Sequence, residues 1–495
     1  MKVRLLALCM FTVTASGAAA EVADGGSQGV QAIAWIERNL APAHSLEQHV
    51  QRRALPDVME EYRIPGLSMA FVDRGKIAWT QAYGFASLEN REAVTGRTVF
   101  TGASLSKPLA AVAALDLVES GLLDLDSDVN RWLQGWQIPA NEFTAESAVT
   151  LRLLLGHRAG VRNDLWSSYL PDEPVPTLLQ MLSGQPPSVE PATAVVTVPG
   201  DAERYSNPGY TIIQKLIEDV TGQAFAATLD EKVFRPSRMH ESTFEQPIPS
   251  DLFARKATGY DGDLEPFAYK IFPYQAAGGV WTTPSDMARF VITLFEDLDG
   301  ANQILAEQTA QQIFERDPAR LAFAKIFDDT SDDLIFRHYG TNQGFSSYLV
   351  GSLQKRQAVV IMTNGHMAFE FLDYVARAVA EFYEWDYLQP EIHPRVAIAA
   401  AELAGYAGEF DLNGTELAFS VEDGGLVMKH EAKPEPTTLT PIGPGTFMAP
   451  EASVRYQFLK ARQNSDGTFV WVRVTAAGGS EDYAGRVEST APAAD

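Results

Sequence analysis

The pattern of apolar and polar positions divides the chain into two parts of different character. Up to about residue 390, alternating apolar runs that are typical of strands occur at both ends, and helical periodicity and proline-rich loops fill the middle. The predicted strands are 67–72, 77–83, 346–350 and 357–362, and the predicted helices are 46–62, 104–120, 208–221 and a last one that ends near 386. This arrangement predicts an α+β fold, in which a sheet domain carries a mainly helical insertion.

From residue 403 onward the pattern contains only short candidate strands, separated by turns rich in Gly, Asn, Asp and Pro. They are 406–411, 416–421, 426–430, 437–442, 454–459 and 469–474. Because no helical periodicity interrupts them, a separate all-β barrel or sandwich is expected. The predicted organisation is a domain over residues 21–390 and a β domain over residues 393–495.

The composition is that of a globular protein, with 46% hydrophobic and 21% charged residues. The net charge of −25, from 39 basic and 64 acidic residues, makes a phosphate backbone an unfavourable partner. No basic cluster indicates binding to an anionic membrane surface. Nucleic acid is therefore excluded as an expected partner, and the sequence indicates no oligomeric state.

Residues 1–20 have the pattern of a secretory signal peptide. Lys2 and Arg4 precede a short apolar run over 5–15, and small residues at 18–20 offer a cleavage site. The alternative, a retained membrane anchor, is disfavoured because the apolar run is short for a bilayer. The expected location is the periplasm or the exterior. Cleavage would remove Cys9, the only cysteine, and with it disulfides, cysteine catalysis and cysteine-based zinc sites.

The first candidate for catalysis is Ser104, which lies at the start of a predicted buried helix with Lys107 three residues later. Residues three apart share a helix face, and the helix start supplies free N–H groups and partial positive charge. Burial favours the neutral amine, which can activate the serine hydroxyl. Taken alone the pattern is weak, because Ser352 and Lys355 have the same spacing in a predicted turn. Ser106 is expected to face elsewhere.

Two later elements contain further candidates. Tyr205 could exchange protons with the nucleophile or leaving group, and Asn207 could bind a substrate amide or cap the helix that Pro208 begins. His338 could donate a hydrogen bond, and Gly340 would let substrate approach the following strand closely. Each has a structural alternative, in core packing or capping. No second histidine lies at metal-ligand spacing from His338, so no metal is expected.

The order of the three elements, Ser104–Lys107, Tyr205–Asn207 and His338–Gly340, resembles that of the β-lactamase-related, penicillin-binding-protein-like serine hydrolases. The resemblance covers about residues 45–390. Further similar segments are 64–68, 150–155, 199–200, 205–210, 221–222 and 277–286. It implies an antiparallel sheet flanked by helices, a mainly helical subdomain, and a site between them. The C-terminal part resembles the lipocalin-like barrels appended to such hydrolases.

The resemblance implies acyl transfer without a metal or organic cofactor. Ser104 would be the nucleophile, and Lys107 and Tyr205 would move protons, with either as the base. The backbone N–H groups of Ser104 and Thr341 would bind the oxyanion. The substrate would be a small ester, an amide or a D-amino-acid peptide.

Two features depart from the family pattern. The third element is His-Tyr-Gly instead of Lys-Thr-Gly, which resembles the esterase and D-aminopeptidase branches more than a dedicated β-lactamase. Residues 154–160 also differ from the Thr-His-Thr-Ser-Gly of relatives. The alternatives are a β-lactamase or D-Ala-D-Ala carboxypeptidase, and a penicillin-binding sensor that is acylated without turnover. Trp166, Tyr169 and Trp281 are candidates for the substrate rim, with loop packing as the alternative.

Overall fold

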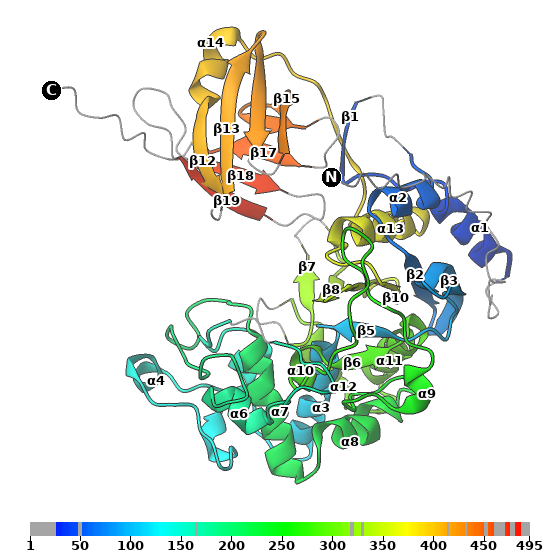
Figure 1. The fold of residues 1–495 in the computed structure, drawn as a ribbon, viewed down its shortest axis with the longest axis vertical. Coiled ribbons are helices and arrows are strands. Elements are labelled where there is room, and N and C mark those ends of the chain that lie inside the picture. Colours follow the sequence, from blue (N-terminus) through cyan, green and yellow to red (C-terminus); the bar gives the residue numbers. More distant parts are fainter. Residues whose placement is uncertain are drawn as a thin grey trace, which may run out of the picture. The chain divides into compact units, whose positions relative to one another are not determined.

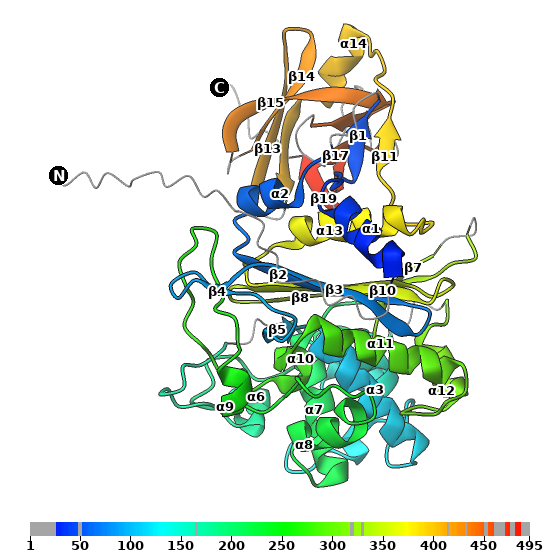
Figure 2. The ribbon, with the colours of Figure 1, turned by 90° about the vertical axis from the view of Figure 1, so that its right-hand side faces the viewer.

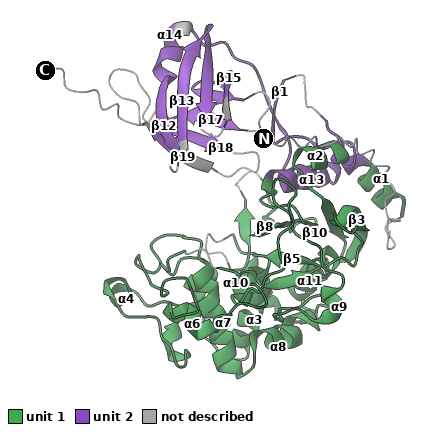
Figure 3. Ribbon diagram, viewed as in Figure 1, with its two compact units in different colours: residues 1–34, 56–369 green, residues 35–55, 370–495 purple. Residues whose placement is uncertain are grey.

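The computed structural model divides the chain into two compact units, one of residues 1–34 and 56–369 and the other of residues 35–55 and 370–495 (Figure 3). The described residues are 26–47, 52–163, 167–316, 321–327, 331–412, 415–430, 433–449, 454–459, 471–475 and 481–486. The predicted signal peptide therefore lies outside the described residues. Among those described, no helix combines the length and the apolar character that crossing a membrane requires.

A seven-stranded antiparallel sheet organises the first unit, in the order β4-β3-β2-β10-β9-β8-β7. Its strands are β2 (Gly66–Asp73), β3 (Lys76–Ser87), β4 (Glu92–Ala93), β7 (Ala324–Ile326), β8 (Ile335–Asn342), β9 (Phe345–Ser352) and β10 (Gln357–Thr363), and a separate pair is β5 (Phe100–Ala103) and β6 (Val280–Thr282). The predicted hairpin between β2 and β3 turns at Arg74 and Gly75, whose φ angles of +51° and +73° suit a two-residue hairpin turn.

Helices α3, α10 and α11 lie along one face of this sheet, which Figure 2 shows nearly edge-on, and α1 and α2 lie on the other side. The helices that lie wholly or mostly in this unit are α1 (Gly26–Ile36), α2 (Leu55–Glu61), α3 (Ser106–Glu119), η1 (Val129–Arg131), α4 (Glu142–Glu146), α5 (Leu151–Leu155), α6 (Leu178–Ser183), α7 (Asn207–Thr221), α8 (Phe225–Leu229), η2 (Asp230–Phe234), α9 (Ser250–Phe253), α10 (Gln275–Gly278), α11 (Pro284–Leu298) and α12 (Glu307–Ile313). Helix α3 is apolar on nearly all sides and is the central helix of the core, as the sequence predicts.

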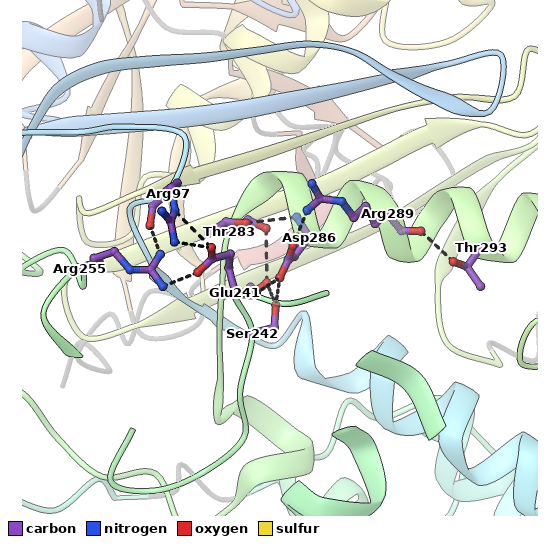
Figure 4. A network of polar contacts seen from close by, with 9 residues as sticks. Arg97, Glu241, Ser242, Arg255, Thr283, Asp286, Arg289 and Thr293 are labelled. Atoms are coloured by element: carbon purple, nitrogen blue, oxygen red, sulfur yellow. Dashed lines mark hydrogen bonds and ion pairs between the residues drawn. The ribbon is translucent and has the colours of Figure 1, made fainter. Parts of the chain in front are cut away.

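A polar network anchors the start of α11 (Figure 4). The buried Asp286 carboxylate accepts hydrogen bonds from the Glu241 N–H at 2.7 Å and the Ser242 hydroxyl at 2.8 Å. Glu241 in turn pairs with two arginines, Arg97 and Arg255. Burial raises the pKa of Asp286, while these hydrogen bonds oppose the shift. The network fixes the segment that contains α10 and β6, which borders the candidate site.

The second unit contains a closed antiparallel barrel of consecutive strands, β12 to β19 (Figure 1). They are β12 (Gly408–Leu412), β13 (Thr415–Glu422), β14 (Gly425–His430), β15 (Lys433–Gly443), β16 (Thr446–Met448), β17 (Arg455–Phe458), β18 (Trp471–Thr475) and β19 (Glu481–Arg486). The unit also contains α13 (Phe369–Phe382), α14 (Ala400–Leu403), η3 (Ala404–Tyr406) and the parallel pair β1 (His44–Leu46) and β11 (Glu391–His393). Aromatic side chains, among them Phe410, Phe419 and Phe458, fill the barrel.

The predicted fold class is confirmed: an α+β domain is joined to an all-β barrel. Some elements differ from the prediction. The predicted helix 46–62 is wrong in its first part, because Leu46 belongs to β1 and the helix begins only at Leu55. Helix α3 begins at Ser106 and not at Ser104. Strands β1, β4 to β8, β11, β16 and β19 were not predicted, and β8 contains His338 and Gly340, which were expected to precede a strand.

Candidate active site

Ser104 lies in a tight turn that joins β5 to α3. The preceding residue, Ala103, has a φ of +48°, which is strained for a residue with a side chain. The Lys107 N–H donates to the Ser104 carbonyl at 3.0 Å, so the turn continues into the helix that begins at Ser106. Ser104 is therefore still one turn before Lys107 on the same side, although it is not itself helical. Its side chain is partly exposed, whereas Ser106 and Lys107 are buried.

The Lys107 side-chain nitrogen contacts three oxygen atoms. Nζ lies 3.1 Å from Ser104 Oγ, 2.9 Å from Asn207 Oδ1 and 2.6 Å from the Ala277 carbonyl oxygen. All three belong to uncharged groups, and the side chain is fully buried. This burial lowers the pKa of Lys107 well below 10.5, because the charged form loses its hydration.

Tyr205, just before α7, and Asn207, its first residue, reach the same point. The Tyr205 hydroxyl lies 2.9 Å from Ser104 Oγ, and Tyr205 as a whole residue is 38% exposed, so the site opens to solvent here. Asn207 was weighed as the N-cap of this helix, but Ser206 holds that position and accepts from the Gly209 N–H at 3.0 Å. The Asn207 side chain is thereby left for Lys107.

Strand β8 passes along the other side of Ser104. A Cβ on Gly340 would lie 2.4 Å from the Gly102 carbonyl oxygen and 3.0 Å from the Ser104 nitrogen, so only glycine fits there. Asn342 and Phe345 flank a two-residue turn and form a hydrogen-bonded pair of the antiparallel ladder. Such pairs alternate with pairs that do not exchange hydrogen bonds, and the next pair, Thr341 and Ser346, is of this second kind. The N–H of Thr341 consequently points away from β9.

His338 lies two residues before Gly340 and therefore on the same face of β8. Its Nδ1 lies 2.7 Å from the carbonyl oxygen of Tyr339. The structure thus places His338 along the strand that borders the serine, while the direct contacts of Ser104 Oγ come from Lys107 and Tyr205.

His157 is a component of the site that is unremarkable in the sequence. Its ring packs against Tyr205 with a centroid distance of 4.4 Å. Nδ1 accepts the Ser206 N–H at 3.1 Å, so in the neutral ring the proton is on Nε2. His157 lies in the segment 154–160, which differs from the corresponding segment of relatives. That difference alone does not indicate what His157 does. His157 therefore contacts Tyr205 through its ring and Ser206 through Nδ1, and so helps to position the Tyr205 side chain.

One further residue, Asn342, connects the elements of the site. The Asn342 side chain donates to Thr101 Oγ1 at 2.9 Å and to the Gly278 carbonyl oxygen at 3.0 Å. These contacts join the end of β8 to β5 and to α10, the helix whose Ala277 carbonyl contacts Lys107. Asn342 follows the third sequence element directly but was not singled out, because an asparagine beside a turn has an ordinary local explanation.

The predicted substrate rim is not supported by the positions of its residues. Trp281 is only 2% exposed, and its ring packs against Phe345 and Tyr269. Tyr169 is 7% exposed, and its backbone pairs with Ile271. Both side chains take part in packing, the alternative given for them, and neither is exposed as an open rim would be. Trp166 lies outside the described residues.

Comparison with known proteins gives a consistent result. The profile of the family described as Beta-lactamase matches residues 52–384. Penicillin-binding protein 4* of Bacillus subtilis is 23% identical over 408 residues, which cover 75% of this chain and 84% of that protein.

Solved structures share the fold. The octameric penicillin-binding protein homologue of Pyrococcus abyssi has a TM-score of 0.59 at 19% identity, and the match covers 87% of this chain and 98% of that one. A D-amino acid amidase from Ochrobactrum anthropi has a TM-score of 0.53 at 22% identity, covering 67% and 98% respectively. These likenesses concern the fold of the chain.

Proposed function

The chain belongs to the beta-lactamase family, whose members are mostly serine hydrolases, and we propose that it cleaves an ester or amide through a covalent acyl-enzyme on Ser104. One observation carries the proposal. The partly exposed Ser104 hydroxyl lies within 3.1 Å of a fully buried lysine amine and within 2.9 Å of a tyrosine hydroxyl. A nucleophile in contact with two proton-transfer groups is the arrangement that acyl transfer requires.

The contacts of Lys107 favour it as the base. A neutral amine has two N–H groups and one lone pair. The Asn207 side-chain oxygen and the Ala277 carbonyl oxygen can only accept, so they take both N–H groups. The lone pair then faces Ser104 Oγ, which can donate its proton to the amine. Tyr205 meanwhile donates its hydroxyl proton to the other side of Oγ.

The proposed acylation conserves protons. Ser104 Oγ attacks the carbonyl carbon while its proton passes to Lys107, and the carbonyl π electrons move onto oxygen. The N–H groups of Ser104 and Thr341 stabilise this oxyanion, and the direction of the Thr341 N–H away from β9 supports the second donor. When the intermediate collapses, the bond to the leaving group breaks. The leaving group takes the hydroxyl proton of Tyr205. Lys107 then returns a proton to Tyr205.

Deacylation reverses these roles with water as the nucleophile. Water loses a proton to the Lys107 and Tyr205 pair, attacks the acyl carbon, and Ser104 recovers its proton as the ester bond breaks. Because Tyr205 is partly exposed at the opening of the site, it is the group that meets both the leaving group and the incoming water. His338 and Gly340 would contact the substrate from β8.

We propose an esterase or a D-stereospecific peptidase. The third element contains His338 where dedicated β-lactamases present a lysine, so the cation that binds a carboxylate of the substrate is replaced by an imidazole. The structural likeness to a D-amino acid amidase supports testing D-configured amides first. β-Lactams and D-Ala-D-Ala peptides are the second candidates, favoured by the similarity to penicillin-binding protein 4*.

A substrate panel tests the proposal. It comprises p-nitrophenyl acetate, D- and L-phenylalanine amide, a D-Ala-D-Ala peptide and nitrocefin. Multiple turnovers with the ester or the D-amide support the proposal. A single stoichiometric burst with every substrate would instead indicate a sensor that is acylated and not released, and preferred turnover of nitrocefin would indicate a β-lactamase.

Replacing Gly340 by alanine is expected to lower kcat by at least about 10-fold, because the new methyl group would collide with the Gly102 carbonyl and push β8 away from the Ser104 nitrogen. The measurement is ester hydrolysis together with thermal unfolding. Gly96→Ala is the matched control, since a Cβ at Gly96 meets no atom within 4 Å. Equal activity of both variants would contradict the placement of β8 at the site.

Replacing His157 by asparagine is expected to lower kcat about 10- to 100-fold with a smaller change in KM, since a displaced Tyr205 mainly affects the chemical step. Asparagine tolerates the φ of +57° that His157 adopts. The control is His240→Asn at an exposed position. A change confined to stability, with kcat unaltered, would show that His157 does not position Tyr205.

A further inference from the structure

A second cluster of reactive side chains lies in the other unit, where it has no part in the proposed hydrolysis. It consists of His44 on β1 and of Glu391 and His393 on β11. The two strands are parallel, with His44 paired to Glu391 and Leu46 to His393. Glu391 and His393 are two apart on one strand, so their side chains share a face. The register places the His44 side chain on that same face.

The three side chains direct one atom each toward a common point. His44 Nδ1 lies 3.1 Å from His393 Nε2, and Glu391 Oε2 lies 3.5 Å from each of these nitrogens. Ligand atoms at about 2.0–2.1 Å from a tetrahedral zinc ion are about 3.3 Å apart. The observed triangle therefore has the dimensions of three ligand positions around a zinc ion.

Hydrogen bonds among His44 Nδ1, His393 Nε2 and Glu391 Oε2 satisfy these three atoms poorly. Each ring nitrogen offers either one proton or one lone pair, yet each faces two partners within the cluster. A cation at the centre would be contacted by all three lone pairs at once. Imidazole nitrogen and carboxylate oxygen are both ligands that zinc accepts.

The surroundings of the cluster include one further charged group. Arg455 on β17 donates to Glu391 Oε2 at 3.1 Å. A carboxylate oxygen has two lone pairs, so this hydrogen bond leaves one for a metal and fixes the orientation of the carboxylate, as second-shell contacts do at metal sites. The histidine side chains are 5% and 15% exposed, and that of Glu391 is 57% exposed. Glu391 is therefore the side of the cluster that faces solvent.

We propose that His44, Glu391 and His393 form a zinc site, completed by water, that joins β1 to β11. The two strands are only three residues long, and the bond between them connects parts of the chain that are 349 residues apart. A metal that binds both strands adds its binding free energy to this short pairing. The cluster belongs to the second unit and Ser104 to the first, and the proposed site does not depend on the proposed hydrolysis.

The test is zinc binding to the full chain carrying no histidine tag and purified without chelator. Competition against a chromophoric chelator is expected to give one zinc per chain, and His44→Ala and His393→Ala are expected to raise the Kd at least about 100-fold. His430→Ala, a histidine of the barrel strand β14, is the matched control and keeps the affinity of the parent. Magnesium and calcium, which prefer sets of oxygen ligands, are expected not to compete.

Two further measurements guard against variants that fail to fold. Zinc is expected to raise the Tm of the parent by several degrees, to be reversed by EDTA, and not to raise the Tm of Glu391→Gln, a nearly isosteric change. Cobalt is expected to give the visible absorption bands of a four-coordinate ion in the parent. Absence of stoichiometric zinc binding at micromolar protein, or undiminished binding in the His44→Ala/His393→Ala double variant, would overturn the proposal.

Discussion

Replacing Ser104 by alanine is expected to lower kcat/KM for an ester substrate by about 10⁴-fold or more, with little change in the Tm. The variant loses the hydroxyl oxygen that both Lys107 Nζ and the Tyr205 hydroxyl contact. Without that oxygen no acyl-enzyme can form, and only binding and oxyanion stabilisation remain. The measurement is steady-state hydrolysis of p-nitrophenyl acetate, with thermal unfolding as the test of the fold.

Ser352 provides the matched control, because it begins the second Ser-x-x-Lys sequence of the chain. In the structure Ser352 is the last residue of β9, and its hydroxyl donates to the Asp333 carboxylate at 2.5 Å, so this serine is engaged with an acid and not with a lysine and a tyrosine. Ser352→Ala is expected to retain hydrolysis and to lose some stability. Undiminished hydrolysis by Ser104→Ala would contradict the assigned nucleophile.

Replacing Lys107 by methionine is expected to lower kcat about 10²- to 10⁴-fold, the range that proton transfer by a positioned base contributes. Methionine keeps the length and apolar stem of lysine but cannot accept the Ser104 proton. In the parent, kcat/KM should rise with pH through the lowered pKa of Lys107 and level off well below 10.5, because burial favours the neutral amine. Lys107→Arg is expected not to rescue activity, since guanidinium stays charged.

The burial of Lys107 also predicts how the free energy of unfolding depends on pH. Between the lowered pKa in the folded state and 10.5 in the unfolded state, the unfolded chain binds a proton that the folded chain does not. The contribution of Lys107 to the free energy of unfolding therefore increases as pH rises through this window. Lys107→Met lacks this contribution, so its Tm relative to the parent should fall from pH 7 towards pH 10. A constant difference would indicate that Lys107 is charged in the folded protein.

Much of the fold follows from periodicity in the sequence. The hairpin at 67–83 was predicted because alternating residues surround a turn with Gly75, and helix α3 because its apolar run is long. Strand β16 was missed because it has only three residues, and β19 because polar residues dominate its sequence, Glu481–Arg486. Both are set by closure of the barrel, in which neighbouring strands supply the hydrogen-bond partners.

Only part of the candidate site could be predicted from the sequence. The three elements could be located from residue spacing and resemblance, but the Ala277 carbonyl and His157 could not, because a main-chain acceptor and a packing ring leave no distinctive spacing. Burial of Trp281 likewise depends on tertiary packing. The His44 and His393 pair lies outside any spacing rule, since only the pairing of β1 with β11 brings these residues together.

The most direct test of the central claim is to identify the residue that reacts with a probe directed at activated serines. The parent is incubated with a fluorophosphonate probe, digested, and mapped by tandem mass spectrometry, with Lys107→Met treated in parallel. A hydroxyl activated by its two neighbours predicts one adduct per chain, on Ser104, formed far more slowly in Lys107→Met. An adduct on any other residue, or labelling at the parental rate without the lysine, would contradict the proposed site.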